Sequence, residues 1–292
     1  MQDINFDGAV AVVTGSGAGL GKAYALLLAS RGAKVVVNDI NPENVSEVVS
    51  TIRSTGGTAI GCTVAVGTES AAKEIIGSAV EAFGKIDVLI NNAGNLRDKS
   101  FTKMTADDFT AVYTVHLQGA FFLSQVAYTH MREQNFGRIV FTTSAAGLLG
   151  NFGQANYSSV KSAMVGLART ISVEGKKYNI RANVISPGAA TAMTAGVQGS
   201  DIDMKPESVA PVVAWLCHAD CDLKGQILHA MGGRVACDFI AETQGVFLGD
   251  EISIETVSKN MDQILNRDNY FVPQNLTDTI AVLFKMIENT KL

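Results

Sequence analysis

The sequence has little charge, few cysteines and no long apolar run. Only 17% of its 292 residues are Asp, Glu, Lys or Arg, against about 25% in an average soluble domain. Four cysteines in a chain of this length are too few for a disulfide scaffold. No stretch of about 18 apolar residues is present, so we expect no membrane-spanning helix. The net charge of −5 argues against a nucleic-acid-binding protein, which needs a cationic face.

The chain is instead rich in apolar residues and glycine. Hydrophobic residues make up 47% of it, so it has ample surface to bury and is not a disordered protein. The polar start and the short apolar run after it do not form a signal peptide, and we expect a cytoplasmic, bacterial-type protein with reduced thiols. The final Thr290-Lys291-Leu292 resembles the Ser-Lys-Leu peroxisomal address, which makes the peroxisome the alternative location. The spacing of Cys217, His218, Cys221 and His229 fits no zinc pattern, and we expect no metal site.

Short β-branched runs alternate with longer helical stretches along most of the chain. Seven strands are expected, at residues 10–14, 34–38, 58–64, 86–90, 138–142, 180–185 and 226–230. Helices are expected at residues 20–30, 45–53, 69–83, 107–131, 157–174 and 206–217. This order predicts an α/β fold of the Rossmann type, a doubly wound parallel sheet of seven strands with helices on both faces.

The alternation stops after Gly232-Gly233. Two amphipathic stretches follow, at residues 254–265 and 276–287, and each predicts a helix with an apolar stripe to bury. We therefore expect a dinucleotide-binding domain over residues 1–233, which includes the substrate site. A helical C-terminal extension over residues 234–292 is too short and strand-poor to fold alone, and we expect it to pack on the core or on a partner subunit.

A glycine-rich turn joins the first strand to the first helix, and it carries Gly15, Gly19, Leu20 and Gly21. Glycines let the backbone approach a pyrophosphate, and the start of a helix supplies N–H groups and a positive dipole. Asp39 ends the second strand about 20 residues further on, where a carboxylate can accept both ribose hydroxyls of NAD. It would repel the 2′-phosphate of NADP, and no Lys or Arg follows it before position 53. NAD is therefore the expected cofactor.

Three polar side chains suit the oxidation of an alcohol. Ser144 follows the fifth strand, and Tyr157 and Lys161 lie one helical turn apart on one face. A phenol with a pKa of about 10 is a poor base at neutral pH, but a neighbouring ammonium lowers that pKa. A hydroxyl such as Ser144 can hydrogen-bond the reacting oxygen. The spacing of Tyr157 and Lys161 alone is equally compatible with two surface residues.

Together with Asn91-Asn92-Ala93-Gly94 and Pro187-Gly188, these motifs resemble the short-chain dehydrogenase/reductase family. The resemblance implies that Tyr157 transfers the proton and that Ser144 orients the substrate oxygen. It implies that Lys161 lowers the pKa of Tyr157 and holds the nicotinamide ribose. It also implies that Asn92, Ala93 and Gly94 line the adenosine-ribose side of the cleft.

The segments 95–101, 115–117, 150–158 and 214–218 are similar to one branch of that family. This branch contains the (3R)-hydroxyacyl-CoA dehydrogenase part of the peroxisomal multifunctional enzyme type 2, also called 17β-hydroxysteroid dehydrogenase type 4, and stand-alone bacterial relatives. The resemblance implies NAD-dependent oxidation of a fatty or steroid side-chain (3R)-3-hydroxyacyl-CoA to the 3-ketoacyl-CoA, with 17β-hydroxysteroid oxidation as a variant. It also implies a homodimer or homotetramer.

Three positions depart from the family pattern. His116 stands where many members have a catalytic Asn, and it could join a proton relay, hold a water through its backbone, or pack structurally. Ala65 replaces the usual Asp or Asn beside the adenine, so backbone contacts from Ala65 or Val66 are expected instead. The usual Thr near the carboxamide is displaced, and Thr191 is preferred over Thr194 for that position.

Two alternative functions stay open. A 3-oxoacyl-carrier-protein reductase runs the same chemistry in reverse, usually with NADPH, and Asp39 and the long extension count against it. A non-catalytic NAD-sensing module would keep the glycine turn but lose Tyr157 or Lys161, and both are present.

Overall fold

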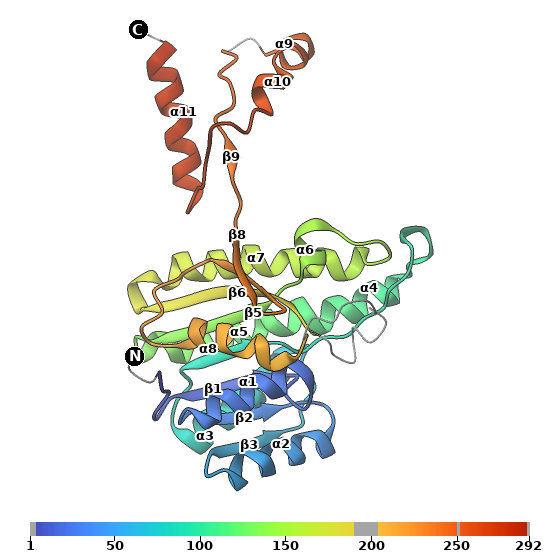
Figure 1. Cartoon of the computed structure of the whole chain (residues 1–292), viewed down its shortest axis with the longest axis vertical. Coiled ribbons are helices and arrows are strands. Elements are labelled where there is room, and N and C mark those ends of the chain that lie inside the picture. The colour runs from blue at the N-terminus through green and yellow to red at the C-terminus, as the bar shows by residue number, and fades with distance from the viewer. Residues whose placement is uncertain (1–3, 190–203, 250–251, 291–292) are drawn as a thin grey trace. The chain divides into compact units, whose positions relative to one another are not determined.

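Figure 1 shows the chain as a computed structural model, which describes residues 4–189, 204–249 and 252–290. The chain divides into two compact units, Met1–Cys237 and Asp238–Leu292. The division follows closely on the predicted end of the dinucleotide-binding domain at residue 233.

An eight-stranded sheet runs through the first unit in the order β3-β2-β1-β4-β5-β6-β7-β8. Each neighbouring pair from β3 to β7 is parallel. The strands are β1 Val10–Thr14, β2 Lys34–Asn38, β3 Thr58–Cys62, β4 Val88–Asn91, β5 Gly137–Thr142, β6 Ile180–Gly188, β7 Ile227–Met231 and β8 Arg234–Asp238. The direction of winding reverses between β1 and β4, and open parallel sheets bind their ligands at such a point, beyond the carboxyl ends of the strands.

The predicted Rossmann-type sheet is confirmed, and one strand extends it. β8 follows β7 after Gly232 and Gly233, whose φ angles of 55° and 80° lie in the left-handed region. Two glycines in this conformation make a tight connection that the sequence pattern did not assign to a hairpin. The predicted sheet of seven strands therefore gains an eighth at its edge.

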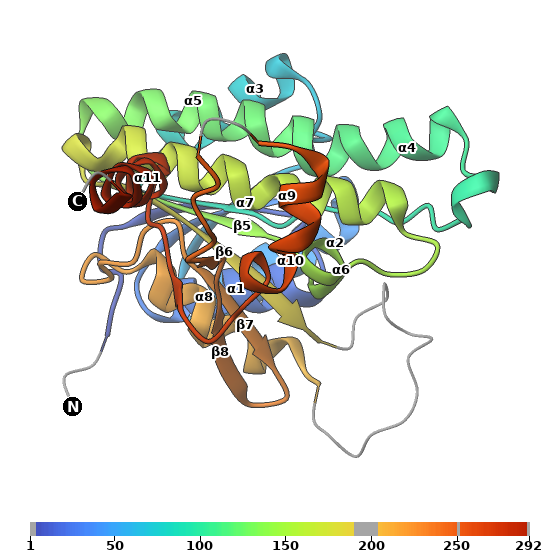
Figure 2. The same ribbon diagram turned by 90° about the horizontal axis from the view of Figure 1, so that it is seen from above.

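Helices cover both faces of the sheet, as Figure 2 shows from above. They are α1 Gly19–Ser30, α2 Pro42–Ser54, α3 Glu69–Phe83, α4 Ala106–Tyr113, α5 Gly119–Glu133, α6 Ala145–Leu149, α7 Ala155–Gly175 and α8 Ala210–Cys217. One core cluster holds buried side chains of α1, α2 and α8, and the other holds those of α3, α5 and α7. Alternate residues of β1 enter the two clusters: Ala11 and Val13 the first, Val10 and Val12 the second. Burial on both faces explains why this strand is a continuous apolar run.

The predicted long helix over residues 107–131 is interrupted. α4 is followed by a π-helical turn, Thr114–Gln118, and α5 begins at Gly119. Such turns are rare and occur frequently at functional sites. This one carries His116.

The second unit contains α9 Ile254–Lys259, α10 Met261–Ile264 and α11 Leu276–Thr290, as the two amphipathic stretches predict. Two short strands were not predicted: β9 Glu242–Thr243 pairs antiparallel with β10 Tyr270–Phe271. The Thr243 hydroxyl donates a 2.8 Å hydrogen bond to the Ile264 carbonyl, which ties this pair to α10. No helix in the described part of the chain has both the length and the apolar character to cross a membrane.

Candidate active site

The glycine turn after β1 has the geometry of a phosphate cradle. Gly15 and Gly19 have φ angles of 62° and 54°, which favour glycine. A Cβ on Gly21 would lie 2.2 Å from the Gly15 carbonyl oxygen, so no side chain fits there. α1 begins after Ala18 without a side-chain cap, and the first N–H groups of a helix have no intrahelical partner. These groups can bind the pyrophosphate of a dinucleotide. The cofactor roles of Gly15, Gly19 and Gly21, and of Leu20 in the same first turn, stay predictions.

Asp39 lies beside this turn, one residue after the end of β2. Its Oδ2 accepts a 3.1 Å hydrogen bond from the Gly17 N–H, and its Oδ1 accepts one of 3.0 Å from the Asn41 N–H. Each carboxylate oxygen keeps a further lone pair for another donor. Asp39 is therefore held in place with the capacity to accept ribose hydroxyls.

Asn92, which follows β4, is hydrogen-bonded to the start of the glycine turn. Its Nδ2 donates to the carbonyl oxygens of Thr14 at 3.0 Å and Gly15 at 3.1 Å. The Thr14 hydroxyl accepts from the N–H groups of Asn92 and Ala93 at 3.0 and 3.1 Å. The sequence assigned Asn92 to the wall of the cofactor cleft, and the structure adds that its amide is bound within the protein.

The loop that carries Ala65 and Val66 is held from two sides. Asn38, fully buried in β2, donates to the Val64 carbonyl at 2.9 Å. Gln118 of the π-helical turn donates to the Gly67 carbonyl at 2.6 Å. Ala65 is exposed and Val66 is half-buried. Because the short Ala65 side chain has no polar atom, Ala65 can hydrogen-bond a cofactor only through its backbone.

Ser144 and Tyr157 come together at the carboxyl end of β5. Ser144 caps α6, and its Oγ accepts a 3.2 Å hydrogen bond from the Ala146 N–H. Tyr157 projects from the first turn of α7, close enough to Ser144 for the Ser144 side chain to lower the pKa of Tyr157. The structure thus pairs the two hydroxyl groups that the sequence singled out.

Lys161 lies one turn further along α7 and is 3% exposed. Its Nζ donates a 2.6 Å hydrogen bond to the Thr142 carbonyl and lies 5.5 Å from the centroid of the Tyr157 ring. Burial lowers the pKa of Lys161 to about 7. The amine is therefore about half protonated near pH 7.

The pKa of Tyr157 is raised in this structure. Burial raises it, the Ser144 side chain lowers it, and the charge of Asp98 raises it, with a net rise. Lys161 is not among the groups that shift this pKa here, so its predicted lowering of the pKa of Tyr157 stays a prediction. Burial acts on both groups, because it disfavours the phenolate of Tyr157 and removes part of the positive charge of Lys161.

His116 packs against the same tyrosine. It is 2% exposed, and its Nε2 lies 2.9 Å from both the backbone N and the backbone O of Asn95. Burial, together with the charge of Lys161, lowers the pKa of His116 to about 3. The ring is therefore neutral, and it holds the loop that follows β4. A Cβ on Gly94 would lie 2.4 Å from the ring, so Gly94 makes room for it.

A cavity of about 10 Å³ lies between candidate cofactor residues and the buried side chains of His116 and Lys161. Thr14, Val66 and Ala93 line it from one side, and His116 and Lys161 from the other. Candidate cofactor residues and candidate catalytic residues thus meet around one internal space, although they are spread over nearly 150 positions of sequence.

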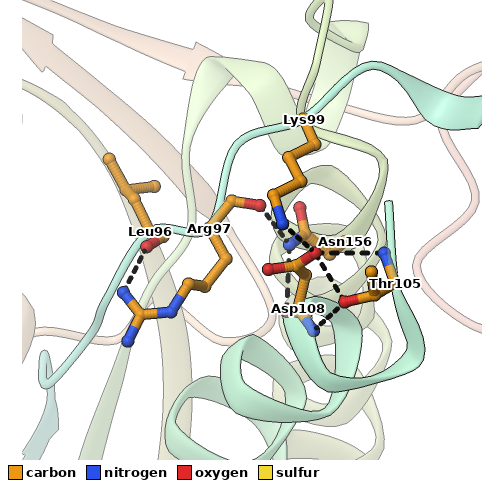
Figure 3. Close-up of polar contacts among 6 residues, drawn as sticks. All are labelled: Leu96, Arg97, Lys99, Thr105, Asp108 and Asn156. Atoms are coloured by element: carbon orange, nitrogen blue, oxygen red, sulfur yellow. Dashed lines mark hydrogen bonds and ion pairs between the residues drawn. The ribbon is translucent and has the colours of Figure 1, made fainter. Parts of the chain in front are cut away.

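Sequence reasoning missed a polar network that holds the loop after β4 against α7 (Figure 3). Asn156 and Asp108 are its buried members, at 0% and 8% exposure. A polar residue directly before Tyr157, in a helix whose cap residue makes no side-chain bond, is the signal that points to Asn156. Thr191, predicted near the carboxamide, lies outside the described residues. Within the described ranges, no three His, Cys, Asp or Glu side chains gather as metal ligands would.

Comparison with known proteins identifies relatives over most of the chain. Residues 9–201 match the family model described as short chain dehydrogenase. The peroxisomal multifunctional enzyme A of Dictyostelium discoideum is 42% identical over 98% of this chain and 66% of its own length. A hydroxyacyl-CoA dehydrogenase of Mycobacterium tuberculosis is 36% identical over 79% of this chain and 80% of its own length.

Two solved structures are similar in fold and sequence. The full-length peroxisomal multifunctional enzyme type 2 of Drosophila melanogaster aligns with a TM-score of 0.85 at 37% identity, over 98% of this chain and 50% of that one. A 7α-hydroxysteroid dehydrogenase complexed with NADH and 7-oxo glycochenodeoxycholic acid aligns with a TM-score of 0.75 at 33% identity, over 80% and 98%. The chain thus spans less than two thirds of the multifunctional enzymes that it matches.

Proposed function

The chain belongs to the short-chain dehydrogenase family, and from this premise we propose that it oxidises a (3R)-3-hydroxyacyl-CoA to the 3-ketoacyl-CoA with NAD. Membership makes it an oxidoreductase that acts on a CH–OH group with a nicotinamide cofactor. The choice of NAD, the acyl-CoA substrate and the residue roles below belong to the proposal.

The observation that carries the proposal is the grouping of Ser144 and Tyr157 beside the buried Lys161, whose Nζ lies 5.5 Å from the centroid of the Tyr157 ring. Ser144 donates its hydroxyl hydrogen to the substrate oxygen, and the Tyr157 phenolate accepts the proton that leaves the substrate hydroxyl. Lys161 holds the nicotinamide ribose and stabilises the phenolate to the extent that its amine stays charged. A nicotinamide held by these residues would supply the hydride acceptor for the carbon that carries the hydroxyl.

Asp39 supports NAD as the cofactor. Its carboxylate lies on the glycine turn, with lone pairs left for ribose hydroxyls, and a 2′-phosphate there would meet a negative charge. No Lys or Arg occurs in residues 40–52 to bind that phosphate. A similar hydroxysteroid dehydrogenase binds NADH.

The name of one relative, a hydroxyacyl-CoA dehydrogenase, supports an acyl-CoA substrate. The proposal includes a fatty chain or a steroid side chain on that acyl-CoA, with 17β-hydroxysteroid oxidation as a variant. The segment that follows Ser144 is apolar, and Leu149 and Phe152 in it are 86% and 90% exposed. Exposed apolar side chains near a catalytic hydroxyl pair suit a bulky hydrophobic substrate.

The extension over residues 234–292 and the assembly complete the proposal. Apolar side chains of its helices, such as Ile254 and Leu276, are 85% and 77% exposed. We infer that the extension packs on the core or on a partner subunit of a homodimer or homotetramer, and that it adapts the common fold to a large acyl-CoA. The relatives named as peroxisomal support a peroxisomal enzyme, with the cytoplasm as the alternative.

Initial rates with NAD and with NADP test the proposal. We expect turnover of a (3R)-3-hydroxyacyl-CoA with NAD, and kcat/KM for NAD at least about tenfold above that for NADP, a difference of about 1.4 kcal/mol. The (3S) enantiomer is the control and should turn over far more slowly. A preference for NADP would contradict the proposal and favour the carrier-protein reductase, and no oxidation of any acyl-CoA or hydroxysteroid would favour the NAD-sensing module.

A further inference from the structure

Asn156 is a fully buried amide directly before Tyr157 in the first turn of α7. Its Oδ1 accepts a 2.8 Å hydrogen bond from the backbone N–H of Tyr157. Its Nδ2 donates to the Arg97 carbonyl at 2.9 Å and to the Asp108 carbonyl at 3.1 Å. One side chain therefore joins the backbone of Tyr157 to two other segments, as Figure 3 shows for the two carbonyl contacts.

The Asp108 end of this network is itself fixed. The Asp108 carboxylate accepts from Lys99 Nζ at 2.8 Å, from the Thr105 N–H at 3.0 Å and from the Thr105 hydroxyl at 2.6 Å (Figure 3). The bond from the Thr105 N–H, together with a 3.1 Å bond from the Asp108 N–H to the Thr105 hydroxyl, forms the capping box that begins α4. The Asp108 carbonyl that accepts from Asn156 is therefore fixed in place, and the Asn156 amide cannot move without breaking this buried hydrogen bond.

The Arg97 end belongs to the loop of residues 95–99, which is bound along the start of α7. The Lys99 N–H donates to the Gly153 carbonyl at 2.9 Å, and Gln154 Nε2 donates to Asp98 Oδ2 at 2.8 Å. His116 fixes the first residue of the loop through its contacts with Asn95. Among these contacts, the hydrogen bond between Asn156 and the Arg97 carbonyl links the loop to the backbone of Tyr157, because Asn156 also accepts from the Tyr157 N–H.

We propose that Asn156 is a positioning residue, which sets the orientation of Tyr157 by joining its backbone to the 95–99 loop and to α4. The inference rests on the proposed function, in which Tyr157 transfers the proton. The plain alternative is a buried Asn that only satisfies nearby backbone groups. Helix formation alone does not require it, because an Ala at this position of the first turn is compatible with a helix.

The positioning role makes the titration of Tyr157 sensitive to Asn156. The charged or titratable groups that face Tyr157 are Asp98 from the loop, Lys161 from α7 and His116 from the π-helical turn. Release of the loop would move Asp98 away and admit water, and both changes favour the phenolate. The rate of oxidation rises with pH as Tyr157 loses its proton, and we call this rising part of the profile the alkaline limb. The alkaline limb should then move to lower pH, although kcat falls because the phenol is misplaced.

The test compares Asn156→Ala with Asn183→Ala in the full chain. Asn183 is also a buried amide that bonds only to backbone: its Nδ2 donates to the Leu223 carbonyl at 2.8 Å, and its Oδ1 accepts from the Gln226 N–H at 3.0 Å. It lies in β6, and its bonds lead to the turn before β7. The two variants lose comparable buried hydrogen bonds, so their melting temperatures should fall together.

We expect kcat of Asn156→Ala to fall about 10- to 100-fold, with its alkaline limb shifted to lower pH and the KM for NAD within about twofold of the parent value. Asn183→Ala should keep the parent's kcat and limb. The inference is overturned if the alkaline limb of Asn156→Ala does not move, whether or not kcat falls. A smaller folded fraction alone would lower the measured kcat without moving the limb. If Asn156→Ala does not fold, Asn156→Ser, which keeps one donor and one acceptor, is judged by the same outcomes.

Tyr157→Phe, measured alongside, separates the two claims. Full activity in that variant would contradict the proposed function itself. Loss of activity in Tyr157→Phe, with an unmoved limb in Asn156→Ala, would contradict only the positioning role.

Discussion

His116 and Tyr157 meet edge to face, with ring centroids 5.4 Å apart and planes at 90°. The same histidine binds the loop after β4 through Asn95. Because burial lowers its pKa to about 3, His116 is neutral at physiological pH. His116 therefore packs against the Tyr157 ring and holds the loop through Asn95, but at physiological pH it does not supply a proton as an imidazolium.

The buried neutral state of His116 predicts acid sensitivity of the fold. Its ordinary pKa of 6.5 is lowered to about 3 in the folded protein, so the unfolded chain binds the extra proton between these values. The stability from this group is fully present above pH 6.5 and is lost as the pH falls toward 3, by up to about 1.4 kcal/mol per pH unit. His116→Asn should flatten this dependence in urea unfolding measured from pH 7 to pH 4.

His130→Asn, in α5, is the matched control for the loss of one histidine and should keep the dependence of the parent. An equal flattening in both variants would show that the acid sensitivity does not come from His116.

The effect of Ser144 on Tyr157 predicts a shift in the pH profile. The Ser144 side chain lowers the pKa of Tyr157 against the raising effect of burial, so Ser144→Ala should raise this pKa further. Oxidation needs the phenolate, and its rate should therefore rise with pH at a higher pH than in the parent. We also expect kcat to fall about 100- to 1,000-fold, because a donor to the reacting oxygen is lost.

The measurement is kcat for oxidation as a function of pH. Ser159→Ala, which removes an exposed hydroxyl from the same helix, should leave the profile unchanged. A limb for Ser144→Ala that stays in place or moves to lower pH would contradict the assigned electrostatics.

The close packing of Gly21 predicts loss of cofactor binding in Gly21→Ala. The new methyl group would lie 2.2 Å from the Gly15 carbonyl, so the turn must shift, at a cost of about 1–3 kcal/mol of stability. NAD affinity, measured by calorimetric titration, should fall at least about tenfold, since the turn no longer presents its N–H groups correctly.

Gly77→Ala in α3 is the control for this prediction. A Cβ on Gly77 meets nothing within 4 Å, and alanine favours a helix by about 1 kcal/mol over glycine. This variant should be more stable with unchanged NAD affinity. Parent-like affinity in Gly21→Ala would show that the turn does not hold the cofactor.

The fold and the grouping of the candidate site were predictable because they depend on local patterns. Alternation of strands and helices fixes a parallel sheet, and residues after parallel strands gather at one edge of it. That rule brings the glycine turn after β1 and Ser144 after β5 to the same edge. The spacing of Tyr157 and Lys161 then follows from the period of a helix.

The features that the sequence did not reveal depend on contacts between distant residues. The π-helical turn at Thr114–Gln118 interrupts a stretch whose apolar spacing reads as one helix. The bonds from Asn156 to Arg97 and Asp108 span 59 and 48 residues. The pKa of Tyr157 depends on how much water the fold excludes from it, which neither spacing nor composition expresses. Local patterns thus predicted which residues would form the candidate site, and tertiary contacts determine how those residues are positioned.

Reduction of NAD by the parent and by Tyr157→Phe, with a saturating (3R)-3-hydroxyacyl-CoA, tests the central claim most directly. The account predicts that the variant still binds NAD and that its kcat is about 100- to 10,000-fold lower, the range for loss of a general acid–base group. An undiminished kcat in Tyr157→Phe would contradict the assignment of Tyr157 as the group that takes the proton.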